Sequence, residues 1–191
     1  QRESVSSIAT SWSTAKTFLR DIVKLAEQYT DVMFVIRGKD ADWWYLEAFE
    51  SEVKKIQATG NIWVDQDYSM LNRSYHLIAH AHAVIARHTS LAEETLAMGI
   101  PTIFHDYSHN LESIRESQTP YLPASLWAHS FDQLGTLLEF ALEDQGHSFQ
   151  AWWEPIRQEV FGDLDDGQVK RRIHHLVESM LGHSGTSASR S

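Results

Sequence analysis

Residues 89–94 place hydroxyl groups and carboxylates where an apolar run, residues 83–86, gives way to helical spacing. The start of a helix offers unpaired backbone N–H groups and the positive end of a dipole, so Thr89 and Ser90 are expected to hold phosphoryl oxygens there. Ser90 and Glu93 also have the spacing of a capping box, which predicts a structural role for Glu93. Glu94 has no such local role, and we expect its carboxylate to accept hydrogen bonds from a vicinal diol such as that of ribose.

Basic and hydroxyl side chains follow other apolar runs, at the edge of a parallel sheet where ligands bind. Arg87 and His88 directly precede the helix start and are expected to complement the charge of a leaving diphosphate. Arg37 and Lys39 follow the second run, where they either contact the same ligand or form a solvated basic loop. Ser13 follows the first run, where it either binds phosphate or caps a helix.

Short β-prone runs alternate with helical spacing along most of the chain. The runs cover residues 5–9, 32–36, 61–64, 83–86, 102–104 and 125–128. This alternation predicts an α/β fold of the Rossmann-like class, a doubly wound parallel sheet of about six strands with helices on both faces. Run 32–36 is continuously apolar, which predicts a strand buried on both faces.

Domain boundaries follow from the same elements. Helices near residues 149–161 and 168–181 are expected to complete a single domain, 1–181, before a Ser- and Gly-rich disordered tail, 182–191. Apolar spacing predicts that residues 14–29 form a helix with one buried side.

Aromatic residues in the helical segments are predicted to pack. Tyr75 is expected on the apolar face of the helix that precedes residues 83–86. The pairs Trp43–Trp44 and Trp152–Trp153 are expected to be buried in the core or against another domain.

The composition excludes several classes of protein. A net charge of -10 argues against a binder of nucleic-acid backbones, because such proteins neutralise phosphates with Lys and Arg. The absence of Cys excludes disulfides and thiolate metal sites and fits a reducing cytoplasm. No apolar run approaches the roughly 20 residues that span a bilayer, so no transmembrane segment is expected.

Two further polar clusters invite a functional interpretation. His76, His80, His82 and His88 lie close in sequence, but they lack the carboxylate of an H-E-x-x-H motif, so we expect no metal site. Residues 105–110 follow the run 102–104 and either line the ligand crevice or form a plain turn.

Residues 89–101, TSLAEETLAMGIP, resemble the nucleotide-binding segment of GT-B glycosyltransferases and of the related UDP-N-acetylglucosamine 2-epimerases. Those families carry small or hydroxyl residues, then Glu, then Gly-x-Pro. The resemblance implies that Glu94 binds the ribose of a sugar nucleotide and that Thr89 and Ser90 contact its diphosphate. The order of predicted elements resembles the C-terminal, donor-binding half of a GT-B enzyme. That half binds a nucleotide-diphosphate sugar as substrate, and the family works without a cofactor or a bound metal.

The resemblance implies a nucleotide-sugar-binding domain of a glycosyltransferase in polysaccharide or cell-surface glycan biosynthesis, in the cytoplasm or at the inner face of the membrane. The general base would belong to an N-terminal acceptor domain outside this chain, so the chain alone is expected to bind donor without turnover. One alternative is a UDP-sugar 2-epimerase-like or CDP-glycerol phosphotransferase-like enzyme domain. Another is a non-catalytic nucleotide-binding module, because residues 11–16 lack the usual glycines. The sequence leaves the nucleotide base, the sugar and the acceptor open.

Overall fold

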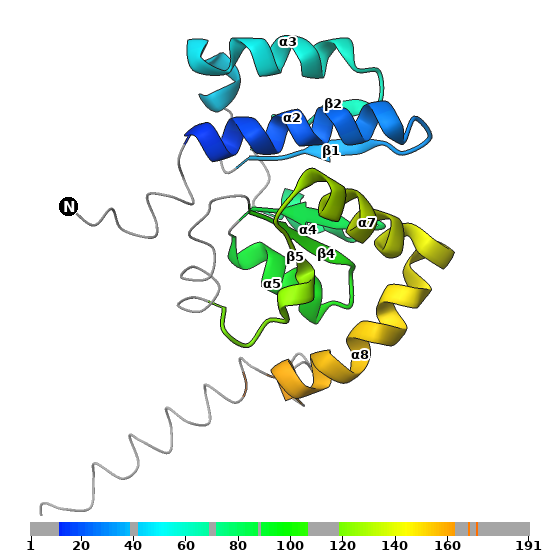
Figure 1. The fold of residues 1–191 in the computed structure, drawn as a ribbon. Helices are drawn as coiled ribbons and strands as arrows, with labels where there is room; N and C mark the ends of the chain where they lie inside the picture. The colour runs from blue at the N-terminus through cyan, green and yellow to red at the C-terminus, as the bar shows by residue number, and fades with distance from the viewer. Residues whose placement is uncertain are drawn as a thin grey trace, which may run out of the picture.

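The computed structural model of the chain describes residues 12–38, 42–68, 72–87, 89–106, 119–162, 168 and 171 (Figure 1). The α-helices are α2 (Trp12–Gln28), α3 (Glu50–Ala58), α4 (Arg73–Ile78), α5 (Ser90–Ala97), α7 (Phe131–Leu142) and α8 (His147–Phe161). The strands are β1 (Phe34–Ile36), β2 (Ile62–Val64), β3 (Val84–Ala86), β4 (Thr102–His105) and β5 (Trp127–Ala128). Short 3-10 helices are η1 (Asp42–Tyr45), η2 (Glu47–Phe49), η3 (Ala124–Leu126) and η4 (Glu143–Gly146). No helix within these ranges is both long and apolar enough to cross a bilayer.

The strands form two parallel sheets, a two-stranded sheet β1–β2 and a three-stranded sheet β3–β4–β5. The chain is therefore a mixed α/β protein with parallel sheets, which confirms the α/β part of the prediction. The described strands do not form the single predicted sheet of about six strands, because they are divided between two sheets. The predicted first strand, residues 5–9, lies outside the described residues.

Helices pack on both faces of the three-stranded sheet. On one face, Phe104 and Trp127 stack with ring centroids 4.6 Å apart and belong to a buried cluster with residues of α5 and α8. On the other face, Ile103 and Ala128 belong to a second cluster, which includes residues of α2, α3 and α7. Neighbouring residues of a strand point to opposite faces, so each strand contributes to both clusters.

Helix α2 supplies much of this second cluster and lies beside α3 (Figure 1). Its buried residues are Leu19, Asp21, Ile22, Val23, Leu25 and Ala26. The predicted buried side of residues 14–29 is thus confirmed. Asp21 is a carboxylate among apolar neighbours, and its burial requires a polar partner.

Alternate side chains of the first strand of the two-stranded sheet are exposed, so the prediction that run 32–36 is buried on both faces is wrong. Phe34 and Ile36 point into the core, whereas Met33 is 63% exposed and Val35 is 43% exposed. Trp63, opposite Val35 in β2, is 44% exposed. These three side chains are not part of either core cluster.

Helix α8 holds the carboxyl end of α5. Gly99 follows that end with a φ of 75°, a left-handed conformation that glycine adopts without strain. Trp153 Nε1 donates a hydrogen bond to the carbonyl oxygen of Leu96 at 2.8 Å, and its side chain is buried. Trp43 and Trp44 are half-buried against the α2 cluster. Packing in the core therefore accounts for these tryptophans, as predicted.

Candidate functional site

The start of α5 lies at the carboxyl edge of the three-stranded sheet, because α5 follows β3 directly in the chain. Thr89 is the N-cap, with extended backbone at φ -157° and ψ 138°, and its hydroxyl accepts the N–H of Leu91 at 3.4 Å. Ser90 is the first helical residue, so the prediction that Ser90 caps this helix is wrong. The physical reason is that Thr89 already has the extended backbone that an N-cap requires, and its oxygen satisfies a first-turn amide.

Glu94 extends from the surface of α5 and does not turn into the interior. Its Oε2 accepts a hydrogen bond from the hydroxyl of Tyr75 at 2.5 Å. This hydrogen bond to the Glu94 carboxylate is the main cause that raises the pKa of Tyr75. Tyr75 belongs to α4 and is 45% exposed, so it does not lie on a buried apolar face as predicted.

Glu93, the neighbouring glutamate, also receives a tyrosine hydroxyl. Tyr121 Oη donates to Glu93 Oε2 at 2.7 Å. Burial and this bond raise the pKa of Tyr121 to about 12. The structure therefore gives Glu93 a structural contact, but with Tyr121 instead of the predicted capping box.

Arg87 connects the end of β3 with the start of α2. Its Nη2 donates to the hydroxyl oxygen of Thr14 at 2.6 Å. The Arg87 side chain is half-buried, and this desolvation lowers its pKa. The negative charge of Asp106 raises the pKa of Arg87, but by less than burial lowers it. The guanidinium of Arg87 is therefore engaged with α2, and its contact with a ligand stays a prediction.

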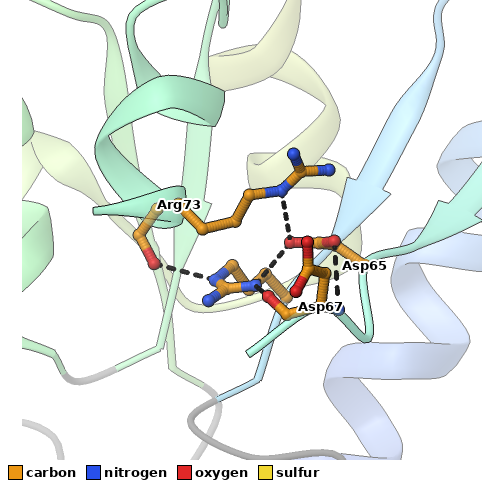
Figure 2. Close-up of polar contacts among 5 residues, drawn as sticks. Asp65, Asp67 and Arg73 are labelled. Atoms are coloured by element: carbon orange, nitrogen blue, oxygen red, sulfur yellow. Dashed lines mark hydrogen bonds and ion pairs between the residues drawn. The ribbon is translucent and has the colours of Figure 1, made fainter. Parts of the chain in front are cut away.

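Arg37 is part of a polar cluster at the carboxyl ends of β1 and β2, together with Asp65, Asp67, Arg73 and Ser74. Arg37 Nε donates to Ser74 Oγ at 2.8 Å, and its Nη1 donates to the backbone oxygen of Asp67 at 3.0 Å and to Asp65. Asp65 also receives Arg73 Nε at 3.4 Å (Figure 2). Arg37 is therefore held in an ion-paired cluster and is not the solvated loop residue of one predicted alternative, while its contact with a ligand stays a prediction.

The carboxylate of Asp65, at the centre of this cluster, is shielded from water. Asp65 is 1% exposed, and two guanidinium groups compensate its buried charge. The guanidinium of Arg37 lies over the ring of Tyr68 at 4.7 Å, and that of Arg73 over Trp63 at 5.6 Å. The cluster thus ties β1 and β2 to the first two residues of α4 (Figure 2).

His105, expected to open a turn or line the crevice, is the last residue of β4 and is buried. Its Nε2 lies 3.1 Å from Asp21 Oδ2 on α2. The prediction for residues 105–110 is therefore wrong at His105, because its side chain is buried in the core. Asp106 is half-buried beyond the strand end, and residues 107–110 lie outside the described ranges.

The structure brings together only some of the predicted site residues. Ser90 and Glu94 belong to α5, Thr89 is its N-cap, and Arg87 precedes it. Lys39, His88 and the side chain of Ser13 lie outside the part of the chain that the structure describes. The sequence did not identify Tyr75 as a site residue, because its aromatic ring fitted an apolar helix face. It did not identify Asp65 either, although Asp65 directly follows a predicted strand.

The described ranges contain no group of three or more His, Asp or Glu side chains placed to hold a metal ion. In comparisons with protein families, curated proteins and solved structures, no family model, protein or structure matches the chain.

Proposed function

We propose that this chain is the nucleotide-sugar-binding domain of a GT-B-type glycosyltransferase that acts in polysaccharide or cell-surface glycan biosynthesis. The observation that carries the proposal is the exposed carboxylate of Glu94, one turn inside a helix that begins at the carboxyl edge of a parallel sheet. In open α/β sheets, nucleotides bind at this edge because strand ends and helix starts converge there. Glu94 would accept the hydroxyls of the ribose.

The start of α5 would hold the diphosphate. Thr89 accepts the N–H of Leu91 with its oxygen, which leaves the hydroxyl hydrogen available for a phosphoryl oxygen. Ser90 and His88 would add donors, and Arg87 would offset the negative charge as the bond between sugar and phosphate breaks. Lys39 and Ser13 remain proposed contacts from their sequence positions. Arg37 would act by ordering the edge of the sheet through Asp65.

We further propose that the two sheets are parts of one doubly wound sheet, with residues 5–9 as the strand between β1 and β3. In the described structure β1 pairs with β2 alone and β3 pairs with β4 alone, so each has an edge without a described strand. Residues of β1, β3 and β4 share one core cluster. A right-handed crossover through α2 would place residues 5–9 next to β1 and give the Rossmann strand order.

A substitution tests this sheet. Ile8→Asp would place an unpaired charge at the centre of the sheet and lower the free energy of unfolding by about 3 kcal/mol or more, as measured by urea denaturation. Gln1→Asp is the control and is expected to change it by less than about 0.5 kcal/mol. Equal effects of the two substitutions would contradict the central strand.

Nucleotide binding tests the function. The chain is titrated with UDP, CDP and GDP while tryptophan fluorescence is followed, and at least one of them is expected to bind. Glu94→Gln is expected to lower the affinity for that nucleotide about tenfold, because a hydrogen bond to a charged group is lost. The matched control is Glu93→Gln, which changes the neighbouring glutamate and is expected to leave affinity unchanged. Binding of none of the three nucleotides, or equal losses in both variants, would contradict the proposal.

A further inference from the structure

The bond between Tyr75 and Glu94 has a defined direction. An ionised carboxylate only accepts hydrogen bonds, so Tyr75 must be the donor in the 2.5 Å contact with Glu94 Oε2. The hydroxyl hydrogen of Tyr75 is therefore committed, while its oxygen keeps acceptor capacity. Elsewhere in the described ranges, no residue bonds the second carboxylate oxygen, Oε1.

Two acceptors thus lie side by side at the surface, Glu94 Oε1 and the Tyr75 oxygen. A vicinal diol presents two O–H donors on neighbouring carbons and can give one hydrogen to each acceptor. We propose that Tyr75 is a specificity-determining residue of this site, which orients Glu94 and accepts one of the two ribose hydroxyls while Glu94 accepts the other. The inference rests on the proposed function and narrows the ligand to ribonucleotides with both hydroxyls intact.

The position of Tyr75 is fixed by its neighbours in sequence. Arg73 and Ser74 belong to the same short helix, α4, and both contact the buried cluster around Asp65 and Arg37 (Figure 2). These contacts anchor the first turn of α4, so the tyrosine that follows them is held in place without being buried. Such anchoring reduces the entropy lost when a ligand binds.

The chain contains a matched control for this pair. Tyr121 donates to Glu93 as Tyr75 donates to Glu94, and the two tyrosines are 46% and 45% exposed. Substitution of either tyrosine by Phe removes one hydroxyl that donates to a glutamate of α5. Only the loss at Tyr75 is expected to alter recognition of the diol.

The experiment measures dissociation constants of the best-bound of UDP, CDP and GDP and of its 2′-deoxy and 3′-deoxy analogues. The wild-type chain is expected to bind the ribonucleotide about tenfold more tightly than either analogue, the effect of one hydrogen bond in a charged pair. In Tyr75→Phe, preference over one of the two analogues is expected to fall to about twofold or less, because the variant no longer accepts the hydroxyl that this analogue lacks. Tyr121→Phe is expected to keep the wild-type preference.

The outcomes separate the two proposals. The role of Tyr75 is overturned, while the proposed function stands, in two cases. In one, Tyr75→Phe keeps the wild-type preference for the ribonucleotide over both analogues. In the other, it lowers the affinity for the ribonucleotide and for both analogues equally. If the wild-type chain binds no nucleotide, or Glu94→Gln has no effect, the proposed function is overturned and the role of Tyr75 with it. Thermal unfolding of each variant verifies that α4 and α5 remain folded.

Discussion

His105 Nε2 lies 3.1 Å from Asp21 Oδ2, and both side chains are 3% exposed. The contact joins the end of β4 to α2 across 84 positions of sequence. The edge of the Phe18 ring packs against the imidazole at a centroid distance of 5.2 Å. Because both polar groups are removed from water, this contact provides part of the hydrogen bonding that their burial requires.

Asp21→Ala is expected to lower the free energy of unfolding by about 2 kcal/mol, because the buried His105 loses this hydrogen-bond partner. Urea denaturation measures the change. Lys24→Ala removes the exposed partner of Asp21, at 3.1 Å from its Oδ1, and is expected to cost less than about 1 kcal/mol. Equal losses in the two variants would show that the buried contact has no special weight.

Asp65→Ala is expected to lower the free energy of unfolding by about 3 kcal/mol, because it leaves Arg37 and Arg73 without their shared carboxylate. The comparison is Lys54→Ala, whose ion pair with Glu50 is exposed on both sides and contributes less than about 0.5 kcal/mol. Denaturant titration of both variants gives the difference. A loss in Asp65→Ala no larger than that in Lys54→Ala would contradict the stabilising role of the cluster.

Tyr121 is expected to ionise only at high pH, because its pKa is raised to about 12. Burial is the larger cause, and the hydrogen bond to Glu93 is the next. The folded-state pKa lies above the ordinary value of 10.0, so the stabilisation from the neutral hydroxyl is complete below pH 10 and disappears as pH rises through about 12. Ultraviolet titration of tyrosinate in the wild-type chain and in Tyr121→Phe isolates this group. Glu93→Gln is expected to lower the pKa of Tyr121 toward its ordinary value of 10.0. An unchanged titration of Tyr121 in this variant would refute the contact.

Trp153→Phe is expected to cost about 2 kcal/mol of unfolding free energy, because the carbonyl of Leu96 loses the indole N–H that caps α5. Trp152→Phe provides the matched comparison at the half-buried neighbour and is expected to cost about 1 kcal/mol. Thermal and urea unfolding compare the two variants. If the Trp152 variant is the less stable one, the hydrogen bond is not the dominant contribution.

Local patterns were sufficient to predict the elements around α5. The apolar run before Arg87 and the hydroxyls after it predicted a strand and a helix start, and these are β3 and α5. Helical spacing likewise predicted the buried side of α2. These features depend on neighbours in sequence, which is why they could be inferred without a structure.

Contacts between distant residues could not be predicted in this way. The spacing of Ser90 and Glu93 favoured a capping box, but Tyr121, far along the chain, provides the partner of Glu93. Arg37 at a strand end was expected to face a ligand or solvent, whereas Asp65 binds it. The partners of Glu93 and Arg37 both come from distant parts of the chain, which spacing along the sequence does not reveal.

Helix α4 contains six residues, too few for a helix to persist by itself in water. Its order depends on the bonds that Arg73 and Ser74 make with Asp65 and Arg37. The amide hydrogens of α4 are therefore expected to exchange with deuterium through local opening, well before those of the 17-residue α2.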